Sequence, residues 1–306
     1  MKEKIYIIIV TYNGMRWLEE CLSTTKPYPV VVIDNNSTDD TVHFIEQHYP
    51  ELILLKQHEN LGFGKSNNIG IKYALEQDCH GVFLLNQDAY LEPDTISNLY
   101  DFYVANQEYG LLSPIHLDGS GKRLDRNFSH YLEYDHNHNF YSDALLRDVE
   151  GCYDVPFVNA AAWFLPRKSL EDIGGFDPIF HHYGEDDNYC QRLIYHKRKI
   201  GVLAKTWVRH DREYKIKNNL SLTPTDYFKK SEHIFKKVWA DISKETSEKE
   251  VHYPLQRQFL KTILFFLRGK FSVAKKQLKL YKFQKKWLKE VLISKSINRK
   301  NGAHYI

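Results

Sequence analysis

Short apolar runs alternate with amphipathic segments along the first hundred residues. The run Ile5–Thr11 is continuous and β-branched, which is typical of a strand buried on both faces. Three similar runs follow, separated by segments with apolar residues at helical spacing. The predicted strands span 5–11, 30–33, 52–56 and 82–85, and the predicted helices span 15–23, 39–49, a segment ending near 76, and 93–106. This alternation predicts an α/β fold with a mostly parallel, doubly wound sheet.

After residue 110 the alternation is less regular. The sequence Asp118–Gly121 indicates a turn in a hairpin, and the polar, aromatic stretch 127–147 predicts a functional or mobile loop. We expect two domains, an α/β body over residues 1–215 and a helical extension over residues 216–306. Further strands are predicted at 155–165 and 200–208, and further helices at 166–173, 185–196, 227–243, 256–271 and 273–294.

Charge is divided unevenly between these domains. The net charge is +3, but 14 of the 42 Lys and Arg residues lie after residue 254, where Glu290 is the single acidic residue. A basic tail attracts anionic lipid, nucleic acid or an acidic protein. Apolar residues around Lys261 and Arg268 favour lipid, because they give the tail the character of an interfacial helix. We therefore expect an anionic membrane surface as partner, and no nucleic acid because the body is acidic.

Apolar runs and cysteines indicate the compartment. The run Ile5–Val10 is too short for a signal peptide, and no stretch of about 18 apolar residues predicts a spanning helix. The four cysteines form no C-x-x-C pair, which favours free thiols in a reducing compartment. We expect a cytoplasmic protein that is peripheral at the inner face of the cell membrane.

Four acid-bearing fragments follow predicted strands or precede a predicted helix. They are Val32–Ser37, Leu84–Ala89, Gly184–Asp187 and Val208–Asp211. Open α/β sheets bind ligands at the carboxyl ends of their strands. Carboxylates and one imidazole at this edge can hold a hard divalent cation and supply a general base. This is the chemistry of attack on a diphosphate-activated substrate.

Each fragment also has a purely structural interpretation. Asp34 can accept from a nucleobase or ribose, or belong to an N-cap cluster. Asp88 can ligate Mg²⁺ or Mn²⁺, or lie in a solvated turn. The acids 185–187 can deprotonate a hydroxyl, or stabilise the start of a helix. The sequence Gly62–Asn67 lacks the third glycine of a dinucleotide fingerprint, but its helix N-terminus and Lys65 can approach a phosphate.

The order and spacing of these fragments resemble the family 2 inverting glycosyltransferases, which have the type-A nucleotide-diphospho-sugar fold. The resemblance covers roughly residues 4–212 and is greatest for the rhamnosyltransferase-like branch used in bacterial surface polysaccharide assembly. It is carried by Ile9–Asn13, Val32–Asp39, Asn60–Gly64 with Asn68 and Gly70, Leu84–Asp88, Gly174–Asp177, and Gly184–Asp187 through Cys190 and Arg192.

The resemblance implies a role for each matching residue. The donor would be a dTDP- or UDP-linked sugar, and the acceptor a saccharide that is lipid-linked. The metal would be Mg²⁺ or Mn²⁺. Asn86 replaces the first acid of the D-x-D motif, and Asn188 replaces a common Asp. The implied donor-binding residues are Thr11, Tyr12, Asn13, Asp34, Asn36, Lys65, Asn86 and Gln87, the metal ligands are Asp88 and His210, and the catalytic residues are Asp186, as base, and Glu185 beside it.

Two other functions compete with glycosyl transfer. A sugar-nucleotide pyrophosphorylase would have a glycine-rich, basic phosphate loop after the first strand, and Thr11–Arg16 fits that pattern poorly. A non-catalytic scaffold could bind nucleotide or membrane in a polysaccharide assembly complex. The presence of Asp88, Asp186 and His210 together argues against such a scaffold.

Overall fold

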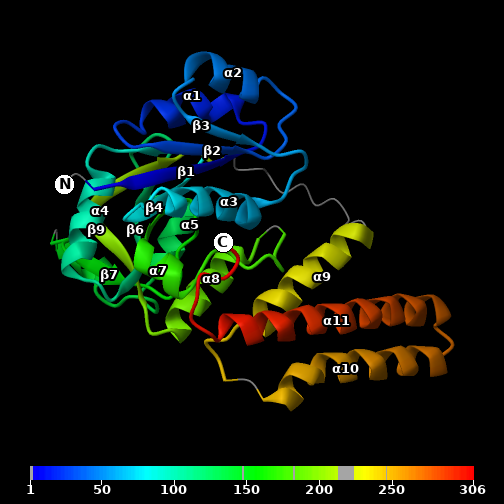
Figure 1. The fold of residues 1–306 in the computed structure, drawn as a ribbon. Helices are drawn as coiled ribbons and strands as arrows, with labels where there is room; N and C mark the ends of the chain where they lie inside the picture. The colour runs from blue at the N-terminus through cyan, green and yellow to red at the C-terminus, as the bar shows by residue number, and fades with distance from the viewer. Residues whose placement is uncertain (1–2, 147, 182, 213–223, 246) are drawn as a thin grey trace. The chain divides into compact units, whose positions relative to one another are not determined.

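The apolar runs of the sequence form the strands of one sheet (Figure 1). The computed structural model describes the chain except for residues 1–2, 147, 182, 213–223 and 246. The sheet order is β3-β2-β1-β4-β8-β6-β9-β5, and β7 pairs with β9. Its strands are β1 (Ile5–Thr11), β2 (Val30–Asp34), β3 (Ile53–Lys56), β4 (Gly81–Asn86), β5 (Ala89–Leu91), β6 (Tyr109–Asp118), β7 (Cys152–Asp154), β8 (Ala162–Pro166) and β9 (Lys199–His210).

The predicted α/β sheet is confirmed, but only part of it is parallel. Strands β3, β2, β1 and β4 are parallel, whereas β8 is antiparallel to both β4 and β6. Only the end of the strand predicted at 155–165 is a strand, β8, while β7 comes just before the predicted range and pairs with β9 elsewhere in the sheet. Apolar periodicity locates a buried strand but carries no information on its direction, so the sequence did not reveal this mixed half.

Helices cover both faces of the sheet. Ile5, Ile7 and Ile9 pack on one face with residues of α1, α2 and α4, while Tyr6 and Ile8 pack on the other with residues of α3 and α8. This burial of successive side chains on opposite faces explains the continuous apolar run. The helices of this part are α1 (Met15–Ser23), α2 (Thr41–His48), α3 (Phe63–Glu76), α4 (Thr95–Ala105), α5 (Arg126–Ser129), α6 (Phe140–Leu146), α7 (Arg167–Asp172) and α8 (Glu185–Tyr195).

The stretch predicted as a loop at 127–147 contains three short helical elements within its described residues. They are α5, the 3-10 helix His130–Leu132, and α6. Asp125 caps α5 by accepting a hydrogen bond from the N–H of Phe128 at 2.8 Å. Phe128, Leu132 and Phe140 are buried in the apolar core. The segment is therefore anchored to the body by aromatic and aliphatic side chains, which its polar average composition conceals.

The chain forms two compact units. One comprises Met1–Lys215 together with Asn301–Ile306, and the other comprises Ile216–Lys300. The sequence placed residues 301–306 in the extension, but they contact the body. The N–H of Gly175 donates to the carbonyl of His304 at 2.8 Å, and the N–H of Gly302 donates to that of Asp172 at 2.8 Å. Hydrophobic periodicity does not predict such long-range backbone contacts.

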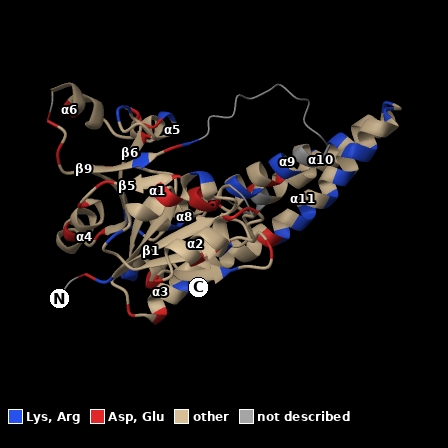
Figure 2. Ribbon diagram, turned by 90° about the horizontal axis from the view of Figure 1, so that it is seen from above, with Lys and Arg blue, Asp and Glu red and all other residues tan. Residues whose placement is uncertain are grey.

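The second unit consists of α9 (Pro224–Trp239), α10 (Glu248–Leu267) and α11 (Phe271–Asn298). A capping box between Ser247 and Glu250 begins α10, and α10 and α11 pack as a hairpin. Lys and Arg residues are spread along α11 (Figure 2). No helix in the described part of the chain is both long and apolar enough to cross a membrane.

Candidate active site

The carboxyl ends of four strands, β1, β2, β4 and β9, lie at one edge of the sheet. Thr11 at the end of β1 pairs with Asp34 at the end of β2, and Asn86 ends the neighbouring parallel strand β4. Because β8 is antiparallel to both β4 and β6, and β9 is parallel to β6, strand β9 runs in the direction of β4. His210 at the end of β9 therefore lies on the same edge as Thr11, Asp34 and Asn86.

Asp34 presents a carboxylate oxygen that is free to accept a hydrogen bond. The side chain is buried, and its Oδ2 accepts from the N–H of Ser37 at 3.1 Å. Its Oδ1 is also buried and has no hydrogen-bond partner among the described residues. Buried polar atoms are nearly always paired, so an orphan acceptor at a ligand-binding edge indicates a missing hydroxyl or N–H donor.

The loops after β1 and β2 are joined by hydrogen bonds. The N–H of Asn13 donates to Ser37 Oγ at 2.9 Å, and the N–H of Thr38 donates to Asn13 Oδ1 at 2.8 Å. Asn13 and Asn36 have positive φ of 49° and 67°, a conformation that asparagine tolerates better than most residues. Asn36 and the Tyr12 ring are exposed beside this junction. They are available to a ligand at the edge.

Gln87 is hydrogen-bonded to the end of β1 and the residue after it. Its Oε1 accepts hydrogen bonds from the Thr11 hydroxyl at 2.8 Å and from the Tyr12 N–H at 3.0 Å. A Cβ atom on Gly14 would lie 2.5 Å from Gln87 Oε1, so only glycine leaves room for the Gln87 side chain in this position. The sequence grouped Gln87 and Thr11 with the donor-binding residues, and the structure shows that they also bind each other.

Asn35, which the sequence did not single out, connects this edge to α3. Its Oδ1 accepts from the N–H of Leu61 at 2.8 Å and from the hydroxyl of Ser66 at 3.0 Å. Gly64 packs closely on the acidic motif, since a Cβ atom there would lie 2.9 Å from Phe176 Cβ and 3.5 Å from Glu185 Cβ. The start of α3 is therefore in contact with the segment that carries Glu185.

Lys65 is the sequence neighbour of Gly64 and Ser66, but its side chain lies on a different face of α3. It lines a hollow of about 270 Å³ together with the C-terminal residues Tyr305 and Ile306. Because its neighbours Gly64 and Ser66 face the acidic motif and Asn35, the Lys65 side chain projects away from them. The structure thus does not bring Lys65 together with the other predicted donor-binding residues.

Asp88 and His210 form a pair at the centre of the edge. The Nε2 atom of His210 lies 3.3 Å from Oδ1 of Asp88, and the His210 side chain is only 2% exposed. Donors about 2.1 Å from one cation and at right angles are about 3.0 Å apart, so this spacing fits two neighbouring ligands. Among the described residues no group of three or more His, Cys, Asp and Glu side chains could hold a metal. The pair fits a hard cation whose other ligands are phosphate oxygens and water.

The acidic motif forms the first turn of α8. Burial, assisted by the Asp186 carboxylate, raises the pKa of Glu185 to about 7. The Oε2 atom of Glu185 has no hydrogen-bond partner among the described residues. Asp186 is half-buried, and its Oδ1 accepts from the N–H of Asp187 at 2.9 Å. The turn therefore combines a buried carboxyl that retains its proton up to near neutral pH with a more accessible neighbour.

A chain of ring contacts runs from the Asp88–His210 pair to Tyr131. The His210 ring meets His116 edge-on at 6.0 Å, His116 stacks on Phe128 at 4.5 Å, and Phe128 contacts Tyr131 at 6.0 Å. Burial raises the pKa of Tyr131 to about 12, and the carboxylate of Asp186 is close enough to add to this increase. The rings therefore extend from the Asp88–His210 pair to a tyrosine that the charges of Asp186 and Asp187 influence, and the sequence assigned no role to His116, Phe128 or Tyr131.

Asp125 and Arg212 add a charged pair to this region. The Nε atom of Arg212 lies 3.0 Å from Oδ2 of Asp125, which is fully buried. Arg212 follows His210 by two residues, and its charge opposes the increase in the pKa of Tyr131. The sequence signal for Arg212 was its closeness to His210, whereas Asp125 had none.

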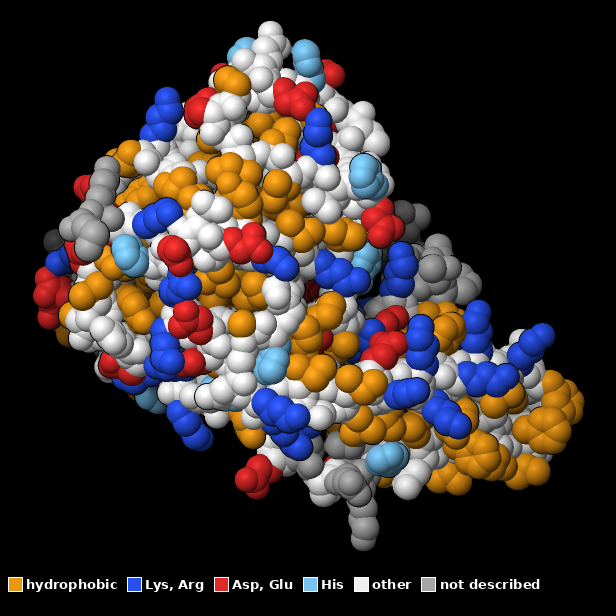
Figure 3. All heavy atoms as spheres, viewed as in Figure 1, with side chains coloured by type: hydrophobic (Ala, Val, Ile, Leu, Met, Phe, Trp, Pro, Cys, Tyr) orange, Lys and Arg blue, Asp and Glu red, His pale blue; other side chains and the backbone are white. Residues whose placement is uncertain are grey.

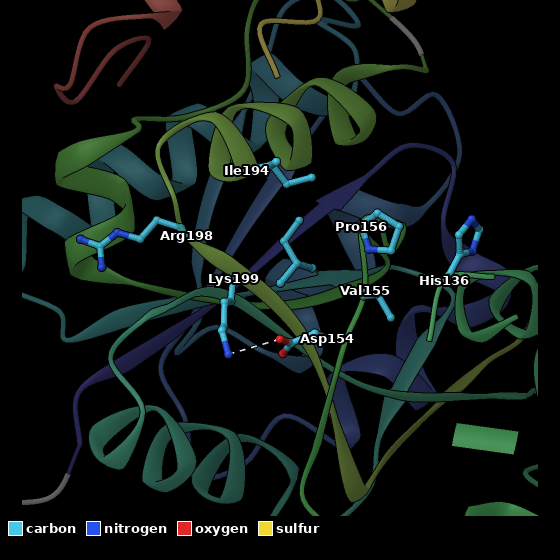
Figure 4. A pocket seen from close by; sticks show the side chains of 8 residues that line it. His136, Asp154, Val155, Pro156, Ile194, Arg198 and Lys199 are labelled. Atoms are coloured by element: carbon cyan, nitrogen blue, oxygen red, sulfur yellow. Dashed lines mark ion pairs between the residues drawn. The ribbon is translucent and has the colours of Figure 1, made fainter. Parts of the chain in front are cut away.

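A separate hollow of about 300 Å³ lies at the other end of β9 (Figure 4). It is lined by Asp154, Arg198 and Lys199 among others, and Lys199 Nζ is 3.2 Å from Asp154 Oδ2. Lys199 begins β9 and His210 ends it, which puts the two about 35 Å apart along an extended strand. This hollow is therefore not part of the site at the strand ends.

Comparison with known proteins places these features in a family. Residues 6–174 match the model described as "Glycosyl transferase family 2". The chain is 31% identical over 137 residues to the dTDP-rhamnosyl transferase RfbF of Shigella flexneri, covering 43% of this chain and 42% of RfbF. It is 26% identical over 220 residues to an N-acetylglucosaminyl-diphospho-decaprenol L-rhamnosyltransferase of Mycobacterium tuberculosis, covering 63% and 71% of the two chains.

The chain spans less than half of RfbF and 24% of another curated relative. Among solved structures, residues 1–349 of TarS from S. aureus in complex with UDP-GlcNAc align with a TM-score of 0.53 at 18% identity, covering 97% of this chain and 89% of TarS. This likeness confirms the predicted fold of the type-A glycosyltransferase kind with a C-terminal helical region.

Proposed function

The chain belongs to glycosyl transferase family 2 and is a glycosyltransferase, and we propose that it transfers a sugar from a nucleoside-diphosphate donor to a hydroxyl of a saccharide acceptor with inversion at the anomeric carbon. The observation that carries this proposal is the chain of ring contacts from the Asp88–His210 pair to Tyr131, whose pKa is influenced by the charge of Asp186. It supports a single site in which one part binds the donor diphosphate and the other part supplies the general base.

The donor nucleoside binds where β1 and β2 end. The unpartnered Oδ1 of Asp34 accepts a hydrogen bond from the base or the ribose, beside the exposed Tyr12 and Asn36. Asn86 and Gln87 follow at the end of β4, towards Asp88. A dTDP- or UDP-linked sugar is the proposed donor, because the name of RfbF specifies dTDP and the structure of TarS contains UDP-GlcNAc.

Asp88 and His210 would hold Mg²⁺ or Mn²⁺ on the donor diphosphate. A divalent cation there supplies positive charge that stabilises the leaving nucleoside diphosphate. Asn86 has an amide where the D-x-D pattern has its first carboxylate. The proposed cation site therefore carries less negative charge and would bind the cation more weakly without the diphosphate.

Asp186 is the proposed general base. Its carboxylate removes the proton of the acceptor hydroxyl while the hydroxyl oxygen forms a bond to the anomeric carbon. The bond from that carbon to the diphosphate oxygen breaks at the same time, and the electron pair leaves with the nucleoside diphosphate. A single displacement inverts the anomeric configuration and needs no glycosyl-enzyme intermediate. Glu185, protonated below a pH of about 7, limits charge repulsion beside Asp186.

The acceptor is proposed to be a saccharide on a lipid diphosphate in bacterial surface polysaccharide synthesis. The name of the mycobacterial relative specifies such an acceptor, and the basic extension of this chain suits an anionic membrane surface. The protein would then work as a peripheral protein at the inner face of the cell membrane.

A donor screen tests the proposal. The protein is incubated with dTDP- and UDP-sugars, with and without Mn²⁺, and a saccharide acceptor, and both nucleotide release and the glycosylated product are measured. Transfer with metal-dependent release of nucleoside diphosphate supports the proposal. A protein that binds nucleotide but releases none from any donor would instead be the non-catalytic scaffold.

A further inference from the structure

The end of the α10–α11 hairpin exposes a cluster of large apolar side chains. Leu267 is 76% exposed, Leu260 65%, Phe271 62% and Phe266 61%. Figure 3 shows apolar side chains gathered at this end of the hairpin. We name the cluster the apolar tip, and it consists of Phe259, Leu260, Ile263, Leu264, Phe266, Leu267, Phe271 and Val273. Contiguous exposed apolar surface of this kind marks an interaction site.

The tip residues keep a large exposed surface although the two helices pack against each other. On α10 they recur with the spacing of Leu260, Ile263, Leu264 and Leu267, which places them along one side of the helix. The two helices are paired by Gln258, whose Nε2 donates to the carbonyl of Gln277 at 3.1 Å, and by ring contacts of Phe259 with Tyr281 and of Phe266 with Phe271. The hairpin is therefore internally paired, and the apolar side of α10 is available to another partner.

Positive charge surrounds the tip. Between residues 255 and 289 the chain has eleven Lys and Arg residues and no Asp or Glu. Arg268 and Lys270 form the connection between the two helices, and Lys275 and Lys276 follow in the first turns of α11. Figure 2 shows Lys and Arg along α11 and at the end of the hairpin. An anionic surface with an apolar interior complements such a combination.

Two other partners fit less well. A second copy of the hairpin would bring the eleven positive charges of residues 255–289 against eleven others, which opposes association. A nucleic acid would need aromatic rings arranged for stacking, but four of the eight tip residues are Leu or Ile. Since no described helix can cross a membrane, a bilayer partner is bound from one side only.

We propose that the apolar tip inserts into the interfacial region of an anionic bilayer, with the flanking Lys and Arg residues on the lipid phosphates. This inference deepens the membrane location in the proposed function, because it assigns the contact to one end of one hairpin. It does not depend on which sugar is transferred.

Vesicle flotation with the full chain tests the inference. Vesicles of equal parts phosphatidylglycerol and phosphatidylcholine are compared with vesicles of phosphatidylcholine alone. The wild-type chain is expected to bind the anionic vesicles, and Phe266→Ser with Leu267→Ser is expected to reduce the partition coefficient by about tenfold or more, since each large apolar side chain contributes strongly to transfer. Arg268→Gln with Lys270→Gln is expected to reduce binding mainly at low salt.

The matched control is Leu292→Ser with Ile293→Ser. These residues are 42% and 53% exposed on α11, more than twenty positions after Phe271 at the tip. The control is expected to bind as the wild type does. Equal loss in both double variants, or binding that survives loss of the tip, would overturn the inference. A wild-type chain that dimerises in sedimentation velocity, with the tip variant monomeric, would assign the tip to a second copy instead.

The result of the vesicle test can be distinguished from the result of the glycosyl-transfer assay. Transfer to a soluble acceptor is measured for the same tip variant, whose apolar substitutions are remote from Asp88 and Asp186 in sequence and belong to the other compact unit. Normal transfer with no vesicle binding by the wild type overturns the tip inference alone. Vesicle binding with no transfer from any donor overturns the proposed function alone.

Discussion

His210 Nε2 lies 3.3 Å from Asp88 Oδ1, although the two residues are separated by 122 positions in the chain. Backbone pairing sets this distance. Ala89 pairs with His210 in the antiparallel β5–β9 ladder, and the N–H of Asp211 donates to the carbonyl of Asp88 at 2.8 Å. The pair is thus held by main-chain geometry on both sides, which preorganises two potential ligands without a bound cation.

Replacing Asp88 tests the role of this pair. Asp88→Asn is expected to reduce kcat/KM for transfer by about a hundredfold or more, because it removes the single carboxylate of the proposed cation site. The loss should be accompanied by a higher Mn²⁺ concentration for half-maximal rate. Asp101→Asn, an exposed position on α4, is the control and should match the wild type. An Asp88→Asn enzyme with unchanged metal dependence would contradict the assignment.

Replacing Asp34 tests the donor nucleoside site. Asp34→Asn exchanges an unpartnered acceptor for an amide, which also has N–H donors. The expected result is a rise of about tenfold in KM for the donor with little change in kcat. The lost hydrogen bond would stabilise the bound donor and the transition state equally. Asp40→Asn, exposed just before α2, serves as the control. A large fall in kcat at unchanged KM would place Asp34 in the chemical step instead.

The raised pKa of Glu185 predicts a pH-dependent stability. Between the ordinary pKa of 4.5 and the folded value of about 7, the folded state binds more protons than the unfolded state. Its stability therefore falls as pH rises through this window. Glu185→Gln removes the effect, so it should be more stable than the wild type at pH 8, on the order of 2 kcal/mol, and similar at pH 5.

Urea unfolding at pH 5 and pH 8 measures this difference. Glu76→Gln, an exposed glutamate at the end of α3, controls for the loss of a carboxylate as such and should show no such dependence. If the difference between the Glu185→Gln protein and the wild type were the same at both pH values, Glu185 would not be the buried carboxyl that titrates near neutral pH.

The docking of the C-terminal residues predicts a large effect at Gly174. Its φ is +84°, and a Cβ atom there would lie 2.1 Å from the carbonyl oxygen of His304. Gly151 has a φ of +69° with no atom near its Cβ position, so Gly151→Ala measures the conformational cost alone. We expect Gly151→Ala to lose about 1 kcal/mol and Gly174→Ala about 3 kcal/mol or more in thermal or urea unfolding. Equal losses would mean that residues 302–305 do not dock on Gly174.

Much of the fold and one side of the site followed from the sequence. The strand ends at Thr11, Asp34 and Asn86 were predicted to meet because parallel strands place their carboxyl ends at one edge. Family resemblance added His210 and Asp186. The edge position of His210 depends on β8, whose antiparallel insertion no periodicity reveals.

Other parts of the site had no local signal. Tyr131 lies in a segment of polar composition, and its place near Asp186 arises because Phe128 and Phe140 anchor that segment in the core. The surroundings of Lys65 also had no local signal. Its residue type and helix N-terminal position suited a phosphate, but the close packing of Gly64 on Phe176 turns the Lys65 side chain to another face.

The central claim is that Asp186 removes the acceptor proton at a site whose donor is held by Asp88 and its neighbours. The most direct measurement compares Asp186→Asn with Asp187→Asn, the next residue in the same helical turn, for donor affinity and for product formation. We predict that Asp186→Asn binds the nucleotide sugar with wild-type affinity but forms product at least about a thousandfold more slowly, as expected for loss of a general base, while Asp187→Asn retains most activity. Normal transfer by the Asp186→Asn protein would contradict the account.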